Sequence, residues 1–365
     1  MAVTVTELRP EVRPQFEALL QHAWEANWGD DLGRAIVHWR YFDRPSGPTW
    51  VLMDGARCVG LLDSMVRTHL LNGQLISVRE TADWFCLPEY RTGYGLALIR
   101  KAMALEEPIL VVGGSAATLE LLPKLRFATA PPARHYVLPV TSRGLVANTL
   151  RQLWWKGEGL AKFAPKFRLS LSPRLRAPDN ADIQRMRADT ELHVPSGQQG
   201  LVQIVERRHW QWLLNMPSEF AAPIGLLFYV NGQRAGHSIS QLEPSATGFD
   251  GRILHMQWHD QAIAVWMLRK TVETLVSSGA GFIRCRVSTP EKFAAIEAAG
   301  FRLSRIAPIH WFSRHVPCPE SVDAGYLRAD DALPWAALRG RRLADRPQGG
   351  ATNHPVRTSV GHVRG

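Results

Sequence analysis

The sequence predicts an α+β protein made of two similar domains, each with a mixed, mainly antiparallel sheet flanked by helices. A pattern of His-Trp, an aromatic residue, a proline, an apolar run and a tight turn occurs near residue 38 and again near residue 209. The offset from Trp39 to Trp210 is 171 residues, and the offset between two later markers, Phe127 and Phe301, is 174 residues. Strand and helix patterns also follow one another in the same order in both copies, so a duplicated domain explains all three observations.

Each copy is expected to begin with a helix and to continue with a β-hairpin. The helical patterns cover residues 12–28 and 200–214. Asp-Gly and Asn-Gly between apolar runs favour tight hairpins, because both residues of the turn accept positive φ angles. The two hairpins therefore turn at Asp54-Gly55 and at Asn231-Gly232.

The remaining elements are a strand, a long amphipathic helix, a short apolar strand, a short helix and a final strand pair. In the first copy the first four of these are expected at 75–87, 95–106, 108–114 and 115–127. In the second copy they are expected at 251–259, 261–279, 280–288 and 288–301. A strand–helix–strand crossover within antiparallel strands is typical of an α+β sandwich.

Composition favours a protein of the cytoplasm. The apolar fraction is 45% and the charged fraction 21%, as in ordinary globular proteins. The longest apolar runs, such as 224–230, have the length of a strand, and the N-terminus lacks the pattern of a secretory signal. The four cysteines form neither a C-x-x-C pair nor a zinc spacing, which indicates reduced thiols.

The positive charge is concentrated outside the two expected domains. The net charge is +10, but residues 141–180 contribute +6 and residues 339–365 contribute +5. The chain is therefore divided into a first domain at 1–140, a basic helical linker at 141–180 and a second domain at 181–330. A basic tail at 331–365 is expected to be disordered. Neutral domains argue against nucleic-acid binding, whereas the linker or tail can contact an anionic surface weakly.

The linker contains an amphipathic pattern over residues 144–171 that carries Trp154 and Trp155. The favoured interpretation is a helix packed across the two domains. A helix that lies on a membrane surface is the alternative.

Two glycines follow the strand expected at 75–87. Gly93 and Gly95 flank Tyr94 in a turn that leads from this strand into a helix, and Pro88 ends the strand. Bare backbone at a helix N-terminus presents free N–H groups and the positive end of the helix dipole. Such a turn is suited to phosphate oxygens, and Arg91 adds a positive charge nearby.

This stretch resembles the GNAT acyltransferase superfamily, whose motif runs from a strand through V-x-P-x-x-R to a glycine-rich turn and a helix. The matching residues are Cys86, Pro88 and Arg91, followed by Gly93 and Gly95. The resemblance implies that the turn binds the pyrophosphate of acetyl-CoA and that the strand backbone pairs with its pantetheine arm. The implied cofactor-binding residues are Phe85, Cys86, Leu87, Arg91, Thr92, Gly93, Tyr94 and Gly95.

The chain departs from the family pattern in three places. Only Thr92 separates Arg91 from Gly93, so the loop is one residue short. Arg126 stands where glycine is common at the end of the next motif. The second copy passes from strand to helix through His259-Asp260 without a glycine, which assigns the cofactor to the first copy.

Acetyl transfer to an amine needs a group that accepts a proton and a group that protonates the departing thiolate. Glu80 is the first candidate for the base and Asp83 the second, whereas Tyr136 is the candidate proton donor. With a period of two, Glu80 shares a face with Ala82, Trp84 and Cys86, and Asp83 lies on the other face. The alternatives are a Glu80 that pairs with an arginine and a Tyr136 that packs in the core. No metal site is expected, because the spaced pair His255 and His259 lies in a strand pattern.

The favoured function is that of an acetyl-CoA-dependent N-acetyltransferase. The resemblance extends to tandem-domain members of bacterial polysaccharide synthesis, so the amine acceptor is expected to be an amino sugar or another polysaccharide precursor. One alternative is a catalytically silent binding or scaffold protein with the same fold. Another is transfer of an aminoacyl group from charged tRNA, as in the related tandem Fem-type enzymes. The sequence does not determine the oligomeric state.

Overall fold

One mixed sheet passes through the whole molecule. The structure is a computed structural model that describes residues 2–24, 31–91, 93–153, 157–165, 167–169, 177–192, 199–245 and 248–323. Within these residues, 14 strands belong to a single sheet. The expected tail at 331–365 lies outside the described residues.

The order of the strands is nearly a mirror of itself about the centre of the sheet. The outer strands of the first half are β1 (Thr4–Glu7), β2 (Thr49–Asp54), β3 (Arg57–Leu71), β4 (Gln74–Cys86) and β5 (Ile109–Val112). Their counterparts in the second half are β7 (Ala181–Arg185), β9 (Ala222–Val230), β10 (Gln233–Ser245), β11 (Gly248–Trp258) and β12 (Ala280–Val287). The centre holds β13 (Arg302–Phe312) and β6 (Ala128–Pro139), and two short strands, β8 (Leu201–Gln203) and β14 (Val322–Asp323), pair beside β3.

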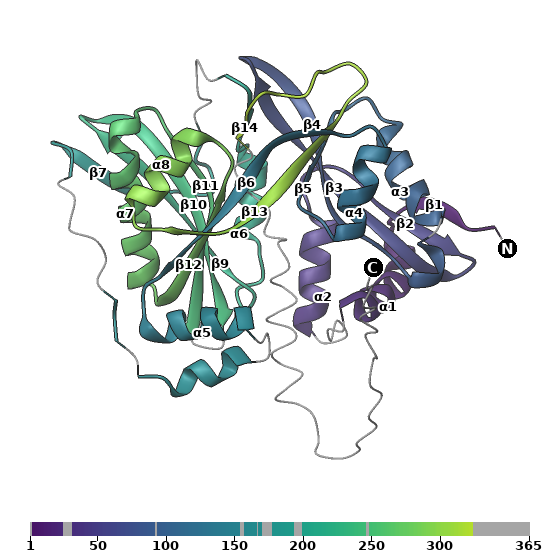
Figure 1. Cartoon of the computed structure of the whole chain (residues 1–365), viewed down its shortest axis with the longest axis horizontal. Helices are drawn as coiled ribbons and strands as arrows, with labels where there is room; N and C mark the ends of the chain where they lie inside the picture. The colour runs from purple at the N-terminus through teal and green to yellow at the C-terminus, as the bar shows by residue number, and fades with distance from the viewer. Residues whose placement is uncertain are drawn as a thin grey trace, which may run out of the picture.

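The two halves exchange their last long strands. Strand β13 follows the second half in sequence but pairs with β5 of the first half, and β6 pairs with β12 of the second half. The exchanged strands also pair with each other, antiparallel, and they cross the middle of the molecule together (Figure 1). The expectation that each copy ends in a strand pair of its own is therefore wrong, because each half completes its sheet with a strand from the other.

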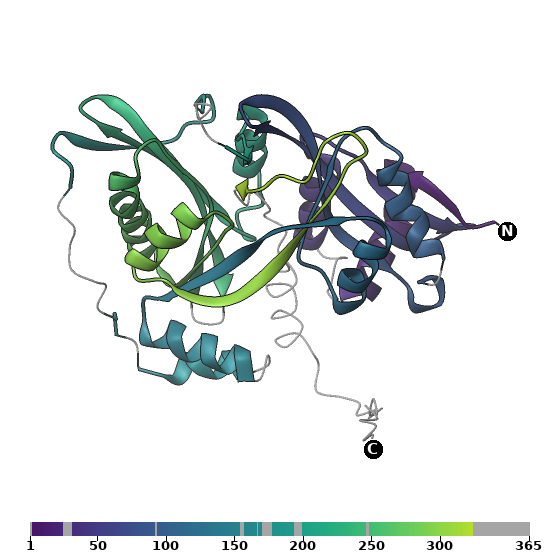
Figure 2. The same ribbon diagram turned by 45° about the horizontal axis from the view of Figure 1, so that its top comes forward.

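Helices cover the sheet in positions that also match between the halves. The first half contains α1 (Arg13–Trp24), α2 (Asp31–Val37), the π-helix η2 (His38–Phe42), α3 (Tyr94–Met103) and α4 (Ala116–Lys124). The second half contains α6 (Arg207–Leu214), α7 (Gln261–Ser277) and α8 (Pro290–Ala298). In Figure 2 the green helices α7 and α8 lie together on one face of the second half. No helix in the described ranges has the length and apolar character needed to cross a bilayer.

Two expected helices differ in the structure. The pattern over 200–214 contains strand β8 and becomes helical only at Arg207, because residues 201–203 pair with β3 instead. The linker pattern over 144–171 forms α5 (Ser142–Leu153) and a separate 3-10 helix, η4 (Gly157–Phe163). Two further 3-10 turns, η1 (Pro10–Val12) and η3 (Pro88–Tyr90), begin with proline, which has no N–H to lose at a helix start.

A reciprocal pair of tryptophans joins the halves near their axis. The indole N–H of Trp39 donates to the carbonyl of Trp212 at 2.7 Å, and the indole N–H of Trp212 donates to the carbonyl of Trp39 at 2.9 Å. Their rings stack with centroids 4.4 Å apart. The symmetry of these contacts makes Trp212 the counterpart of Trp39, rather than the Trp210 that the His-Trp pattern aligns with it.

The second sequence marker is explained by two equivalent helix ends. After α4 the amide of Phe127 bonds the carbonyl of Leu122 at 3.1 Å, and after α8 the amide of Phe301 bonds that of Ile296 at 3.2 Å. Both phenylalanines are buried. The residue before each phenylalanine has a left-handed backbone conformation. It is Arg126, with φ 65°, in the first half and Gly300, with φ 96°, in the second. Arg126 thus occupies a position that favours glycine.

Replacing Arg126 by glycine is expected to stabilise the fold by about 0.5–1 kcal/mol, because the strain of a left-handed non-glycine residue is removed and exceeds the added entropy of the unfolded chain. The reverse change, Gly300→Ala, should destabilise by about 1 kcal/mol. Urea unfolding followed by circular dichroism measures both. A destabilised Arg126→Gly protein would show that the arginine side chain makes a contact worth more than the strain.

Candidate active site

The first half contains an open strand edge between β4 and β5. These parallel strands pair only where Arg79–Thr81 meets Ile109–Val111, although β4 continues to Cys86. Residues 82–85 are partly exposed there. The stretch of β11 that continues past its pairing with β12, residues 254–258, is fully buried. A strand that continues past its neighbour presents backbone groups that another extended molecule can pair with.

A β-bulge at Asp83 shapes this edge. Ala82 pairs with Asp63 and Trp84 pairs with Leu62, so Asp83 has no partner position on β3, and its φ is +32°. The extra residue breaks the expected period of two. Beyond the bulge, the indole N–H of Trp84 donates to the carbonyl of Gly95 in α3 at 3.2 Å. The prediction that Trp84 shares the face of Glu80 is therefore wrong.

The side chain of Asp83 is held by the π-helix η2. Its carboxylate accepts hydrogen bonds from the guanidinium of Arg40 and, at 3.0 Å, from the hydroxyl of Tyr41. Arg40 and Tyr41 are buried, and burial raises the pKa of Tyr41 well above its usual value. A π-helix and a strained residue facing each other are features that often accompany functional sites.

The two glycines of the turn before α3 have different roles. Gly93 precedes α3 with φ 91°, no side chain caps the helix there, and a Cβ at Gly93 would meet nothing within 4 Å. A Cβ at Gly95 would make only ordinary contact with Cys86 at 3.7 Å. Gly93 is thus required by the backbone, and the space on its Cβ side is open. Thr92 lies outside the described residues, and Tyr94 is 45% exposed.

The end of β4 is fixed by local contacts. The Nε of Arg91 donates to the carbonyl of Cys86 at 3.1 Å, which holds this exposed cation beside the start of α3. Burial raises the pKa of Cys86 to about 11, so its thiol stays protonated and acts as a packed side chain. Leu87 is buried and its amide bonds the carbonyl of Val59 at 2.9 Å.

The equivalent place in the second half is filled by the protein itself. The carboxylate of Asp260 accepts from the amide of Ala262 at 2.9 Å, so an acid occupies the start of α7. The ammonium of buried Lys292 donates to the carbonyl of Met256 at 2.7 Å and to both carboxylate oxygens of Asp323, at 2.8 and 2.6 Å. This ion pair closes the edge of β11 that is open in β4.

Glu80 lies in a buried polar group that includes residues from distant parts of the chain. Its carboxylate is 3.3 Å from Nε of Arg67 and 3.3 Å from Nε2 of His69, and it accepts from the amide of Gln203 at 2.8 Å. The alternative that Glu80 pairs with an arginine is thus what the structure contains. Arg67 and His69 alternate along β3, and polar residues at this spacing in an apolar strand are the signal that could have identified them.

Neutral histidines continue this polar group into the second half. Burial, with a further contribution from Arg67, lowers the pKa of His209 to about 3. Burial lowers the pKa of His237 to about 3 and that of His255 to well below its usual value. The rings of His237 and His255 stack 5.0 Å apart on neighbouring strands. Among the described residues, Nε2 of His237 and Nδ1 of His255 have no hydrogen-bond partner.

Tyr136 lies in a different place from the other predicted site residues. It belongs to the exchanged strand β6 and packs in the apolar core of the second half. Its hydroxyl donates to the carboxylate of Glu297 at 2.6 Å, and burial and this bond raise its pKa. Its hydroxyl bond to Glu297 and its ring contact with Phe293 both lie in the second half. Arg40 and Tyr41, which do reach the β4 bulge, directly follow His38-Trp39 of the first His-Trp pattern.

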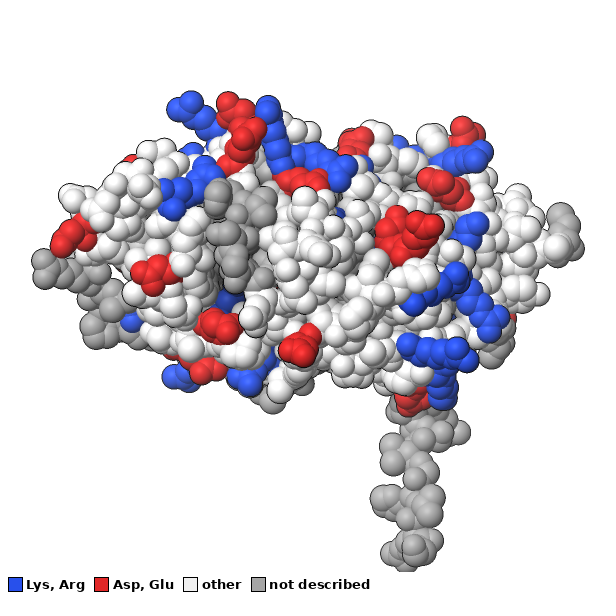
Figure 3. Space-filling view, turned by 90° about the horizontal axis from the view of Figure 1, so that it is seen from above, with Lys and Arg blue, Asp and Glu red and all other residues white. Residues whose placement is uncertain are grey.

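Charge does not mark a basic surface in the view from above the molecule (Figure 3). On the face seen in Figure 3, Lys and Arg side chains are mixed with Asp and Glu side chains. A surface of mixed sign does not favour binding of a nucleic acid.

Neither a family model nor a curated protein sequence matches the chain. Several solved structures are similar in fold. A GCN5-related N-acetyltransferase from Anabaena variabilis has a TM-score of 0.55 at 14% identity, and the match covers 85% of this chain and 72% of that protein's chain. A probable N-acyltransferase from Enterococcus faecalis has a TM-score of 0.51 at 9% identity, with 85% and 72% covered. A tandem GNAT protein from the clavulanic acid biosynthesis pathway has a TM-score of 0.53 at 12% identity and covers 87% of this chain and 100% of its own.

At these identities the similarity shows the fold. It confirms the predicted α+β class and the arrangement of two GNAT-like units in one chain.

The buried histidines make acid sensitivity a test of the polar group. The folded pKa of His209 and of His237 is about 3, below the unfolded value near 6.5. The unfolded chain therefore binds protons that the folded chain does not. Stability should be complete above pH 6.5 and fall toward pH 4, by about 1.4 kcal/mol per pH unit for each histidine.

Urea unfolding at pH 7, 6 and 5 measures how the free energy of unfolding changes with pH. In His237→Gln this change per pH unit should be smaller by the contribution of one histidine. His315→Gln is the control, because water solvates this exposed side chain. A slope that is unchanged in His237→Gln would show that this histidine gains a proton while the protein stays folded.

Proposed function

We propose that the protein is an acyltransferase that binds acetyl-CoA in its first half and transfers the acetyl group to an amine. The observation that carries the proposal is the asymmetry between two otherwise equivalent places. The edge of β4 is partly exposed, whereas the same edge of β11 is buried and closed by Lys292 and Asp323. A duplicated fold has no packing reason to leave one of the two open.

The residues of the first half match the needs of a thioester donor, which supplies an activated acetyl group. The amides that begin α3, from Gly93 to Leu96, are suited to the diphosphate, because no side chain caps them. Arg91 brings a cation to the same place. The partly exposed edge of β4 beside the bulge at Asp83 is the proposed place for an extended pantetheine arm, which the family pattern assigns to Phe85–Leu87.

Gly93→Val is expected to weaken acetyl-CoA binding at least tenfold, because its side chain would enter the space of the diphosphate and remove charge-assisted hydrogen bonds. Gly73→Val is the matched control. Gly73 also has a positive φ, of 86°, with nothing within 4 Å of a Cβ, but it lies in the β3–β4 hairpin.

Isothermal titration calorimetry with acetyl-CoA measures the affinities, and circular dichroism checks that both variants fold. Parent protein that does not bind acetyl-CoA, or equal losses in the two variants, would contradict the proposed donor site.

We assign the acceptor to amines that carry hydroxyl groups, such as amino sugars and other polysaccharide precursors. What supports this is the polar group between the halves. Neutral imidazoles such as His237 and His255 can donate and accept hydrogen bonds, as hydroxyl recognition requires. Glu80 is the proposed base, and Asp83 is the second candidate for that role. The proposed location is the cytoplasm, where free cysteines stay reduced.

A binding protein without catalytic activity is the second candidate function. One observation favours it, since the carboxylate of Glu80 is already engaged by Arg67, His69 and Gln203. A carboxylate held this firmly serves as a positioning group as readily as a base.

Release of free thiol from acetyl-CoA across a panel of amino sugars separates the two functions. For the enzyme, Glu80→Gln should lower turnover by about a hundredfold or more, while acetyl-CoA affinity changes less than about threefold. Asp83→Asn is measured in parallel. A larger loss in Asp83→Asn would identify Asp83 as the base, and parent protein that binds acetyl-CoA without releasing thiol with any amine would support the binding protein.

A further inference from the structure

Large apolar side chains are exposed together on the linker between the halves. Phe163 is 75% exposed, Phe167 58%, Leu160 53% and Leu145 43%. They make up four of the 11 exposed large apolar residues in the described part of the chain, although they fall within 23 residues. Such a concentration is uncommon on a protein surface that faces only water. We call these four residues the linker patch.

Hydrogen bonds join the two segments that carry the linker patch. The amide of Ser142 donates to the carbonyl of Phe167 at 3.0 Å, and Nε of Arg143 donates to the carbonyl of Ala164 at 2.7 Å. The segment around Phe163 and Phe167 therefore lies along the first turn of α5, next to Leu145.

The opposite side of this unit is docked firmly on the second half. A Cβ at Gly144 would lie 2.0 Å from the carbonyl of Gly281 at the start of β12, so the α5 backbone rests directly on the sheet. Ala147 and Ala161 are buried. The small residues of the segment thus face the protein, and the large apolar ones face outward. This division indicates that the patch is displayed by a fixed element.

Cations accompany the linker patch. The ammonium of Lys162 lies 5.1 Å from the ring centre of Phe163, and Arg168 is exposed. Residues 141–180 carry a net charge of +6, whereas the whole chain carries +10. Aromatic and leucine side chains combined with lysine and arginine are typical of surfaces that bind at the interface of an anionic membrane.

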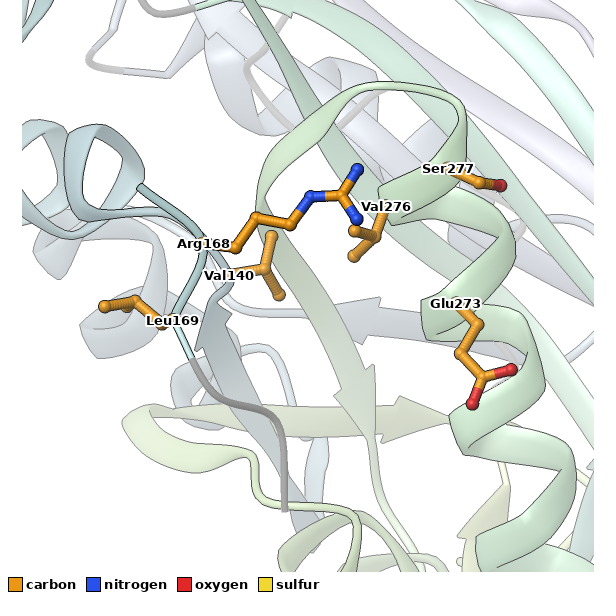
Figure 4. Close-up of a pocket in the computed structure, with 6 residues that line it drawn as sticks. All are labelled: Val140, Arg168, Leu169, Glu273, Val276 and Ser277. Atoms are coloured by element: carbon orange, nitrogen blue, oxygen red, sulfur yellow. The ribbon is translucent and has the colours of Figure 1, made fainter. Parts of the chain in front are cut away.

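An apolar hollow adjoins the linker patch. It has a volume of about 300 Å³ and is lined by Val140, Arg168, Leu169, Glu273, Val276 and Ser277. In Figure 4 the side chain of Arg168 extends across it toward Val276. The carboxylate of Glu273 is ion-paired with Lys270 at 2.7 Å, and Arg168 is exposed and directly follows Phe167 in the chain.

We propose that the linker patch docks on the surface of an anionic lipid bilayer, with its phenylalanines inserted among the headgroups and its cations beside lipid phosphates. A bilayer is favoured over a protein partner because the patch combines outward phenylalanines with cations on a docked element. The docking is independent of the proposed reaction, since it involves neither β4 nor α3.

Co-sedimentation of the full chain with vesicles tests the proposal. Vesicles of phosphatidylcholine alone are compared with vesicles of three parts phosphatidylcholine and one part phosphatidylglycerol. The protein should bind the anionic vesicles about tenfold more strongly, and added salt should weaken the binding. Phe163→Ser/Phe167→Ser should lower the partition coefficient at least about tenfold. Leu303→Ser/Ile306→Ser, which changes two exposed apolar residues of β13, should stay within about twofold of the parent.

Three results would overturn the proposal. One is equal or absent binding to the two kinds of vesicle, and another is parent-like binding by the Phe163→Ser/Phe167→Ser protein. The third is a concentration-dependent dimer in analytical ultracentrifugation that this variant abolishes, because it would assign the patch to a second copy of the chain. Acetyl-CoA affinity should be the same in all variants, which separates this result from the test of the proposed function.

Discussion

The backbone hydrogen bonds between the exchanged strands hold the whole structure together. Strands β6 and β13 pair with each other and with the opposite halves, so neither half has a complete sheet by itself. Unpaired strand edges in the middle of the molecule would be costly and prone to wrong association. The two halves therefore depend on each other for folding, and the reciprocal stack of Trp39 and Trp212 fixes how they meet.

Duplication gave the molecule two equivalent strand edges, and the side chains decide which is open. In the second half, Lys292 satisfies the carbonyl of Met256 and is neutralised by Asp323. A buried ion pair is stable only when both partners and their hydrogen bonds are in place. Asp260 likewise supplies a negative charge where a phosphate would bind. In the first half a glycine precedes α3 without a side-chain cap, and residues 82–85 of β4 stay partly exposed.

The polar group between the halves has a physical cost that calls for an explanation. Buried polar atoms without partners destabilise a fold by about 1–3 kcal/mol each. His237 and His255 belong to the second half, whereas Glu80 and Arg67 belong to the first. Burial lowers the pKa of His255, and the charge of Arg67 contributes to the same shift. Buried polar atoms without a protein partner occur where a ligand or an ordered water forms the missing hydrogen bonds. The proposed acceptor site is consistent with it.

Elements whose causes are local could be predicted from the amino-acid sequence. Asn231-Gly232 makes the second hairpin because both residues take positive φ. The first hairpin turns at Gly55-Ala56, one residue later than expected, because Asp54 still pairs with Arg57 and Gly55 has the positive φ. Gly93 likewise precedes α3 with a positive φ. Tertiary structure alone decided the partners. The exchange of β6 and β13, the bulge at Asp83 and the contacts of Glu80 all join residues distant in sequence, and the periodicity of a strand says which face a side chain takes but not which strand lies beside it.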